Sequence, residues 1–307
     1  MDPVDRHLLN EWCERWLGSV PVRHLFARHH LSSVVGLGLP DGRNVVVKIR
    51  PGATRIAGCV AVQRHLFGSG FPCPEPLLGP APFGSGIATA ETYLADGERL
   101  IADAVGTPLF AELLARLVGS APPLASLPTL EPPPPWVAWG HEGAGIWPRP
   151  DDLNVDLNEE TGATWIDEIG RRVRRRLLAS PGAPIVGHVD WESQNLRWKG
   201  ISPFSVDDWD SVAALSEPGI AGAAAAIFPS SADGRTVAAT VEQTEAFLDA
   251  YQKARAIDWS ADDQEICWAA GMWVLAFNAK KEVSGGGRGY LEHIQRESQE
   301  RLLRAAA

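Results

Sequence analysis

The stretch from residue 186 to residue 210 constrains this chain more than any other, because it carries polar residues at fixed intervals between apolar ones. It reads VGHVDWESQNLRWKGISPFSVDDWD. His188, Asp190 and Asn195 follow the pattern H-x-D-x-x-x-x-N, and Asp208 comes after a short run of apolar, polar and apolar residues. This order and spacing are typical of a phosphoryl-transfer catalytic loop followed by a metal-binding aspartate.

Phosphoryl transfer explains the spacing. A carboxylate must reach the acceptor hydroxyl, while one loop turn away an amide oxygen and a second carboxylate hold magnesium on the nucleotide phosphates. We therefore expect Asp190 to act on the hydroxyl, and Asn195 and Asp208 to bind the metal. The competing interpretation is structural: His188 is a core histidine with satisfied hydrogen bonds, Asp190 and Asn195 are turn residues, and the carboxylates near position 208 form a solvated acidic turn.

The composition is that of an ordinary globular protein. With 307 residues, 45% hydrophobic and 21% charged, the chain is long enough for two lobes or domains. No apolar run reaches the ~18 to 20 residues of a membrane span, and the start, MDPVDRH, is charged instead of signal-like, so we expect a cytoplasmic protein with no membrane partner. The formal net charge of −10 argues against a nucleic-acid partner, which basic stripes would indicate, and is compatible with a cationic substrate.

The cysteines indicate neither a disulfide framework nor a structural zinc site. Cys13, Cys59, Cys73 and Cys267 lie far apart, with no C-x-x-C pair and no histidine at ligand spacing. We expect packed thiols.

The beginning of the chain changes from a helical to a strand period. Residues 4–18 carry apolar side chains at helical spacing and end at Gly18, which favours a left-handed cap. From residue 32 the pattern predicts a hairpin with a turn at residues 40–42 and Lys48 near the end of its second strand. A single strand lysine faces solvent in most proteins. The motif at 186–210 favours the alternative, a cleft in which the ammonium binds nucleotide phosphates.

The next helix, predicted over 55–67, lacks an expected acidic residue. In kinases a glutamate on this helix holds the nucleotide-binding lysine. Here no Asp or Glu occurs between Lys48 and Glu75, and Gln63 is the only amide that could replace it. Either the phosphates orient the lysine directly, or the lobe is less organised without nucleotide.

A strand-like segment at 87–95 and a turn at Asp96 and Gly97 lead into a helix predicted over 99–118. This order puts Glu91 to Tyr93 where a hinge would offer backbone groups to an adenine ring.

Residues 119–152 are rich in proline and glycine and predict a long surface loop. Its Trp136, Trp139 and Trp147 are either packing anchors, the favoured interpretation, or stacking surfaces for a substrate ring.

Helices dominate the remainder. One is predicted over 158–180, where an arginine cluster at 171–176 is interpreted as a solvated face in preference to an anion site. Others are expected over 218–228, 240–251 and 262–283, and a polar helix ends the chain.

Taken together, VVVKIR around Lys48, GSGFPCPEP after the second helix, HVDWESQNLRW and VDDWDS resemble the aminoglycoside phosphotransferase (phosphotransferase enzyme) family, small-molecule kinases with a protein-kinase-like fold. The resemblance spans about residues 20 to 280 and is most specific after residue 186. It implies an α+β, two-lobed fold: a small β-rich nucleotide-binding lobe with a leading helix at 1–95, and a larger, mainly helical catalytic and substrate-binding lobe at 96–307.

The resemblance also implies roles for individual residues. ATP would bind between the lobes with Mg2+. Asp190 would be the catalytic base or hydroxyl-orienting group, His188 a structural support of its loop, Asn195 and Asp208 the magnesium ligands, and Lys48 the phosphate-binding lysine.

Three departures from the family pattern lie within the loop, at Val189, Trp191 and Gln194, in addition to the missing helix glutamate. They leave the kinase class in place and the substrate open, because family members phosphorylate aminoglycosides, other antibiotics, amino sugars, choline, homoserine and methylthioribose.

The expected activity is ATP-dependent phosphorylation of a hydroxyl on a small, amine-bearing molecule, an aminoglycoside or related antibiotic, by a monomer or homodimer. Candidate substrate contacts are Glu192, Glu265, Trp268 and Trp273, since carboxylates and indole faces bind cations; the two tryptophans are alternatively core residues. The alternative functions are a metabolic kinase for an amino sugar, choline or homoserine, and a nucleotide-binding pseudokinase. A magnesium-dependent hydrolase leaves Lys48 unexplained.

Overall fold

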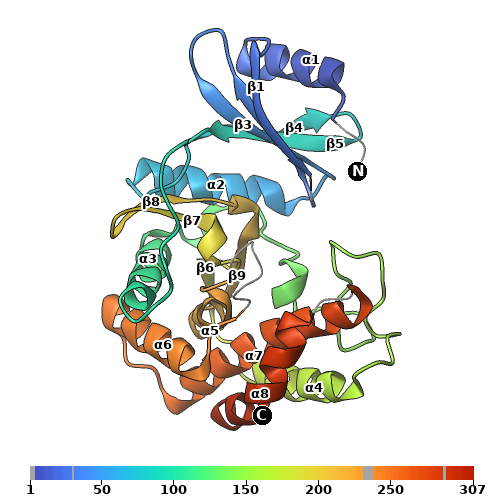
Figure 1. Ribbon diagram of the computed structural model, residues 1–307, viewed down its shortest axis with the longest axis vertical. Coiled ribbons are helices and arrows are strands. Elements are labelled where there is room, and N and C mark those ends of the chain that lie inside the picture. Colours follow the sequence, from blue (N-terminus) through green and yellow to red (C-terminus); the bar gives the residue numbers. More distant parts are fainter. Residues whose placement is uncertain (1–3, 30, 231–237, 286–287) are drawn as a thin grey trace.

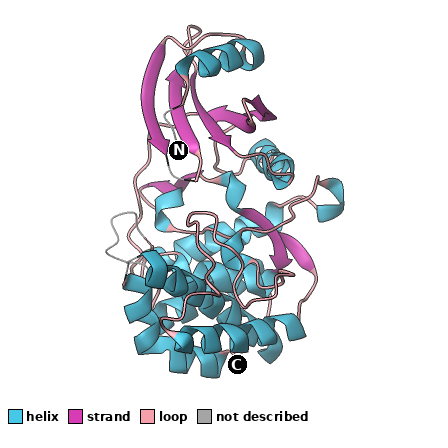
Figure 2. Ribbon diagram, turned by 90° about the vertical axis from the view of Figure 1, so that its right-hand side faces the viewer, coloured by secondary structure: helices cyan, strands magenta, loops and turns pink. Residues whose placement is uncertain are grey.

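Two separate hydrophobic cores divide the chain into a small lobe built on one sheet and a larger helical lobe (Figure 1). The computed structural model describes residues 4–29, 31–230, 238–285 and 288–307. The turned view in Figure 2 shows the long strands gathered at one end and most helices at the other. The predicted α+β class and two-lobed architecture are confirmed.

The small lobe is an antiparallel sheet of five strands in the order β1-β2-β3-β5-β4. Helix α1 (Arg6–Leu17) packs Leu9 and Trp12 into the core of this sheet. It begins at Asp5, whose carboxylate accepts the backbone N–H groups of His7 and Leu8, and ends at Gly18 with a φ of 78°, as predicted. The strands are β1 (Arg23–His29), β2 (Ser33–Gly38), β3 (Asn44–Arg50), β4 (Pro76–Phe83) and β5 (Gly86–Thr92).

Strand β1 was absent from the sequence-based prediction, which begins the sheet at residue 32. Its sequence, RHLFARH, lies mostly exposed at the edge of the sheet. An edge strand with charged residues on its open face does not show the apolar alternation by which half-buried strands are recognised.

Helix α2 (Arg55–Gly68) joins the two lobes. It lies between the sheet and the helical lobe (Figure 1). Cys59, Val62 and Leu66 of α2 belong to the core of the helical lobe, although the helix precedes the lobe boundary expected after residue 95. At its beginning, the Arg55 guanidinium donates hydrogen bonds to the backbone oxygens of Asp210 and Val212. Both packing and hydrogen bonds therefore fix the small lobe against the segment that follows residue 186.

Besides its helices, the large lobe contains two short antiparallel strand pairs, β6 with β9 and β7 with β8. Helix α5 crosses α7 closely, because a Cβ on Gly222 of α5 would lie 2.0 Å from the backbone oxygen of Cys267 on α7. The small residues of α5 allow this approach. The elements are α3 (Gly106–Ser120), α4 (Thr164–Ala179), β6 (Pro184–His188), β7 (Leu196–Lys199), β8 (Ser202–Val206), β9 (Val212–Ser216), α5 (Glu217–Ile227), α6 (Val241–Arg255), α7 (Ala261–Gly285) and α8 (Gly289–Arg304).

Two helices begin later than predicted. Helix α3 starts at Gly106 instead of residue 99, because the Asp103 carboxylate accepts the backbone N–H groups of Val105 and Gly106 and so sets the beginning of the helix. Helix α4 starts at Thr164 instead of residue 158.

The proline-rich segment at 119–152 is a loop with two short 3-10 turns, Leu124–Ser126 and Pro135–Val137. Its tryptophans are anchors, the favoured of the two interpretations. Trp147 is 2% exposed and its indole N–H donates to the Asp167 carboxylate at 2.7 Å, while the indole N–H of Trp136 donates to the Val189 backbone oxygen at 2.9 Å.

The arginine cluster of α4 is only partly the predicted solvated face: Arg171 and Arg175 are exposed, whereas Arg174 and Arg176 bind other segments. The Arg174 guanidinium donates to the backbone oxygens of Trp139, His141 and Gly145 and holds the loop against the helix. Arg176 pairs with Asp262 and Glu265 of α7, so these cations fasten segments of the protein to one another.

The cysteines at 13, 59, 73 and 267 are buried free thiols, as predicted. Among the described residues, no helix is both long enough and apolar enough to cross a bilayer.

The contact between α5 and α7 generates the first prediction. Gly222→Ala places a methyl group against the Cys267 carbonyl, and we expect the free energy of unfolding to fall by about 1 to 3 kcal/mol in equilibrium denaturation. Gly68→Ala is the matched control, because a Cβ there meets no atom within 4 Å; its stability should equal or exceed that of the wild type. Equal stability of the two variants would contradict the close packing.

Candidate active site

A cavity of about 640 Å³ lies between the sheet and the helical lobe. Its size falls within the usual range of small-molecule sites. Lys48 of β3, Tyr93 after β5, and Asn195 and Asp208 of the segment after residue 186 all line it. Residues that the sequence analysis singled out in three distant stretches thus face one space.

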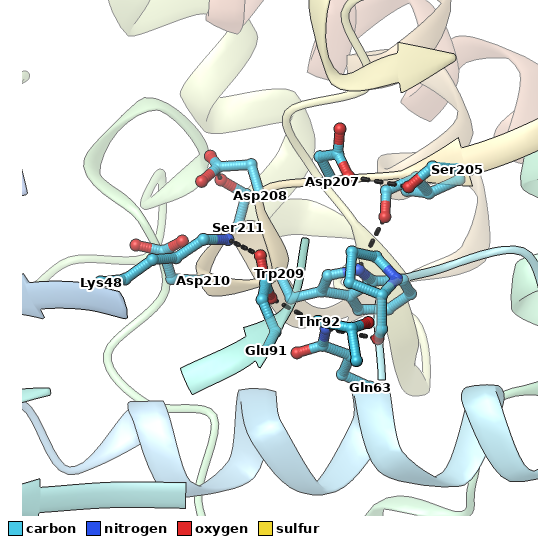
Figure 3. A network of polar contacts seen from close by, with 12 residues as sticks. Lys48, Gln63, Glu91, Thr92, Ser205, Asp207, Asp208, Trp209, Asp210 and Ser211 are labelled. Atoms are coloured by element: carbon cyan, nitrogen blue, oxygen red, sulfur yellow. Dashed lines mark hydrogen bonds and ion pairs between the residues drawn. The ribbon is translucent and has the colours of Figure 1, made fainter. Parts of the chain in front are cut away.

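Lys48 is paired inside this cavity. Its ammonium lies 2.9 Å from a carboxylate oxygen of Glu91 on β5, and the other oxygen of that carboxylate accepts the side-chain N–H of Gln63 on α2 at 3.0 Å (Figure 3). Burial disfavours the charged lysine, but the carboxylates of Glu91, Asp208 and Asp210 raise its pKa above the ordinary value. The lysine is therefore oriented by a strand carboxylate, which neither alternative in the sequence analysis anticipated.

His188 ties the two motif loops together. It is fully buried at the end of β6, and its Nε2 donates to the backbone oxygens of Asp207 and Asp208, both at 3.1 Å. Its Nδ1 accepts the backbone N–H of Asp190 at 3.3 Å. These partners require the neutral tautomer with the proton on Nε2, and burial lowers the pKa of the imidazole to about 4.

Asp190 and Asn195 form a second contact within the loop. The Asn195 side-chain nitrogen donates to the Asp190 carboxylate at 2.7 Å and to its backbone oxygen at 2.9 Å. This directs the amide oxygen of Asn195 away from Asp190. Burial and the nearby carboxylates of Glu192 and Asp208 raise the pKa of Asp190 well above its ordinary value.

Asp208 stands in a strained position. Its φ of 60° is uncommon for a residue with a side chain, and hydrogen bonds with Ser211 hold it there. Burial and the neighbouring Asp210 raise the pKa of Asp208 to about 7. A carboxylate kept in this environment gains stability from a cation.

Asp210, by contrast, has its own cation. Its carboxylate pairs with Arg50 of β3, which is 9% exposed. Burial alone would raise the pKa of Asp210, but Arg50 and Lys48 hold it below its ordinary range. Asp210 is thus paired with Arg50, whereas Lys48 is paired with Glu91.

Aromatic residues form one wall of the cavity. The rings of Phe26 on β1 and Tyr93 lie 5.3 Å apart. Phe26 lies opposite Gly36 on β2, where a Cβ would come within 2.3 Å of its ring. Only a glycine leaves this space, so Gly36 places the Phe26 ring at the cavity.

The predicted hinge segment from Glu91 to Tyr93 lines the cavity, and its backbone contribution to an adenine ring stays a prediction. Glu91 lies inside the sheet, opposite Val46 of β3 and Pro76 of β4, and its side chain is turned to Lys48. The backbone N–H of Tyr93 donates to Asn44 at 2.9 Å. The backbone N–H of Tyr93 is thus engaged by the sheet, and its ring forms part of the cavity wall.

Of the candidate substrate residues, only Glu192 lies near Asp190. Glu265, Trp268 and Trp273 are corrected to structural positions. Glu265 accepts two hydrogen bonds from Arg176, Trp268 is 7% exposed beneath the Arg304 guanidinium, and Trp273 is 0% exposed against Trp147 at 5.1 Å. Residues 266–277 of α7 are all buried, so the two tryptophans belong to the core that surrounds this helix.

Tyr290 of α8 is a residue that the sequence analysis missed. Burial and the carboxylates of Glu192 and Asp190 raise the pKa of its hydroxyl, so its electrostatic environment includes the catalytic-loop carboxylates. It belongs to the final helix, whose polar sequence carries no motif that would connect it to residue 190.

Comparisons with known proteins find likeness in structure alone. No family model matches the sequence. No curated protein matches it either. A solved amicoumacin kinase in complex with AMP-PNP and Ca2+ is 11% identical, with a TM-score of 0.62 over 92% of this chain and 87% of that one.

Two further solved structures resemble this chain in fold. A spectinomycin phosphotransferase in complex with ADP and spectinomycin is 10% identical, with a TM-score of 0.58 over 99% of this chain and 94% of that one. A choline/ethanolamine kinase family protein from Mesorhizobium loti is 16% identical, with a TM-score of 0.58 over 96% of this chain and 95% of that one. The kinase-like fold that the sequence resemblance implies is thus confirmed.

The pair of Arg50 and Asp210 generates the second prediction. Arg50→Met leaves a carboxylate without its cation, and we expect a loss of about 3 kcal/mol in the free energy of unfolding at neutral pH. The loss should shrink below about pH 4, because a carboxyl with a depressed pKa contributes stability only while it is charged. Combining Arg50→Met with Asp210→Asn should recover most of the stability in the same denaturation experiment; additive losses would contradict the pairing.

Proposed function

We propose that the protein transfers the γ-phosphoryl group of ATP to a hydroxyl of a small molecule. The observation that supports this proposal is the meeting of Lys48, Asn195 and Asp208 at one cavity between the lobes, with the Asp190 carboxylate hydrogen-bonded to Asn195. The order of these residues along the chain is that of phosphoryl-transfer enzymes. Solved structures of the same fold that contain AMP-PNP or ADP support it.

Asn195 and Asp208 fit magnesium by their chemistry. Both offer hard oxygen donors, the amide oxygen of Asn195 is turned away from Asp190, and Asp208 is a carboxylate in need of a cation. Among the described residues, no cluster of three or more His, Cys, Asp or Glu side chains could hold a metal. Two protein ligands suit magnesium, because it takes its other ligands from phosphates and water. When bound, it supplies positive charge beside the phosphates.

The protein contributes mainly alignment and charge. The Lys48 ammonium binds phosphate oxygens, and the Phe26 and Tyr93 rings pack against the base. The Asp190 carboxylate receives the acceptor hydroxyl and takes its proton. Because the transition state of phosphoryl transfer is loose, orientation by Asp190 matters more than base strength.

The acceptor is proposed to carry an amine. Glu192 follows Asp190 in the loop, where its backbone N–H donates to the Asp190 backbone oxygen at 2.9 Å, and burial raises the pKa of its carboxyl. Buried carboxylates favour a cationic ligand. An aminoglycoside or related antibiotic fits this chemistry, and so does an amino sugar, choline or homoserine.

A pseudokinase function loses its main support. It rested on the absence of a carboxylate that would hold Lys48, and Glu91 fills that role in space.

The third prediction concerns Asp190. Asp190→Ala should lower turnover by about 10²- to 10⁴-fold and leave ATP affinity within a few-fold, since the carboxylate acts on the acceptor. The assay measures ADP release in the presence of ATP and magnesium, with aminoglycosides, amino sugars and amino alcohols as acceptors. Asp258→Ala, at an exposed position of the large lobe, is the control and should match the wild type. Wild-type turnover in Asp190→Ala would refute the assignment.

The fourth prediction concerns Asp208. Its raised pKa means that the charged form is disfavoured in the protein without metal, so Asp208→Asn should raise the melting temperature of the ligand-free protein at pH 8. In the wild type, ATP with magnesium at about 100 times its dissociation constant should add about 2.7 kcal/mol of stability, and EDTA should abolish most of it. Asp208→Asn should lose this stabilisation. A wild-type response to magnesium and ATP in the variant would exclude Asp208 as a ligand.

A further inference from the structure

The lysine of the cavity has its carboxylate partner on a neighbouring strand. Lys48 lies opposite Thr89 where β3 pairs with β5, and Glu91 is two residues further along β5. Side chains two residues apart on a strand point to the same face. Lys48 and Glu91 are therefore diagonal neighbours across one ladder, within reach of a long side chain, and the 2.9 Å contact results from the register of the sheet.

Helix α2 provides an amide to this pair in place of an acid. Gln63 is 3% exposed, and its side-chain nitrogen donates to Glu91 at 3.0 Å and to the Pro74 backbone oxygen at 3.0 Å. Both amide hydrogens are used. A glutamate at position 63 would face the Glu91 carboxylate with like charge, so glutamine is the residue type that this arrangement requires.

The neighbouring charges are separated in the same way. Arg50 on β3 takes Asp210, and the remaining carboxylate near Lys48 is the metal-ligand candidate Asp208. An ammonium has three hydrogens to donate. One goes to Glu91, and no other acceptor among the described residues takes the remaining two, which leaves them to ligands in the cavity that Lys48 lines together with Asp208.

We propose that Glu91, held by Gln63, is the positioning residue of Lys48 and takes the place of the helix glutamate found in kinases. The proposal rests on the proposed function and extends it to regulation. Because both members of the pair belong to one sheet, the lysine is placed for phosphate without any movement of α2. A movement of α2 would withdraw the Gln63 amide from Glu91 but would leave the carboxylate beside Lys48.

The test exchanges the two side chains. Glu91→Gln removes the carboxylate, Gln63→Glu adds a second one, and the double variant moves the carboxylate from strand to helix while keeping both shapes. We expect Glu91→Gln to weaken the binding of ATP with magnesium by about 10- to 100-fold, the value of a charge-assisted hydrogen bond, with a higher KM for ATP and a lower kcat. The double variant should recover at least tenfold of that loss, since the carboxylate then reaches Lys48 from the other side.

A readout without nucleotide separates this proposal from the function. In ¹⁵N NMR of the ligand-free protein, the Lys48 ammonium should give a protected resonance in the wild type and the double variant and lose it in Glu91→Gln. Glu75→Gln, which neutralises an exposed carboxylate just before β4, should leave binding and the resonance unchanged.

Each outcome is decisive. Wild-type ATP binding by Glu91→Gln would overturn the proposal, because Glu91 would then contribute nothing to the binding of phosphate by Lys48. Tighter binding would overturn it as well, because Glu91 would then compete with phosphate for Lys48. Failure of the folded double variant to recover would overturn it as well. If the resonance behaves as expected but the wild type binds no ATP with magnesium, the positioning of Lys48 stands and the proposed function fails.

Discussion

The active site depends on one buried imidazole. His188 donates a single proton to two carbonyl oxygens of the Asp208 loop and accepts the backbone N–H of Asp190. A protonated ring would need an acceptor at Nδ1, where a backbone N–H already points, so the neutral form is the only one that satisfies both loops. Two further backbone bonds, from Asp207 to Asn195 and from Val189 to Ser211, run parallel to it. The carboxylates and the amide of the motif are brought together by these bonds, which lie beneath the surface of the cavity.

The second constraint is the attachment of the sheet to the helical lobe. Arg50 and Arg55 both contact residues 210–212, and α2 buries its apolar side chains in the core of the large lobe. The position of Lys48 relative to Asp208 is therefore fixed by the packing of the sheet and α2 against the segment at residues 210–212. Solved structures of antibiotic phosphotransferases share this two-lobed plan at sequence identities near 10%, which indicates how few residues need to be kept for the arrangement of the lobes.

Sequence reasoning succeeded where a signal is local. The spacing of Asp190, Asn195 and Asp208 encodes a loop, and the β-branched run around Lys48 encodes a strand. It failed where contacts are set by topology. Strand β5 lies between β3 and β4 in the sheet. The periodicity of the sequence does not reveal this order, so it could not predict that Glu91 contacts Lys48. The prediction that Trp273 contacts the substrate failed for another reason. Aromatic residues at helical spacing show the same sequence pattern whether they face a ligand or a core.

The contact between Gly36 and Phe26 has a consequence for the base. Because Gly36 has no side chain, the Phe26 ring packs directly against the backbone of β2. The distance between this ring and the backbone helps to set the shape of the cavity beside Tyr93. Any larger residue would push the ring into the cavity by the width of a methyl group and narrow the slot available to a flat heterocycle. The position of the Phe26 ring at the cavity wall thus depends on the absence of a side chain at Gly36.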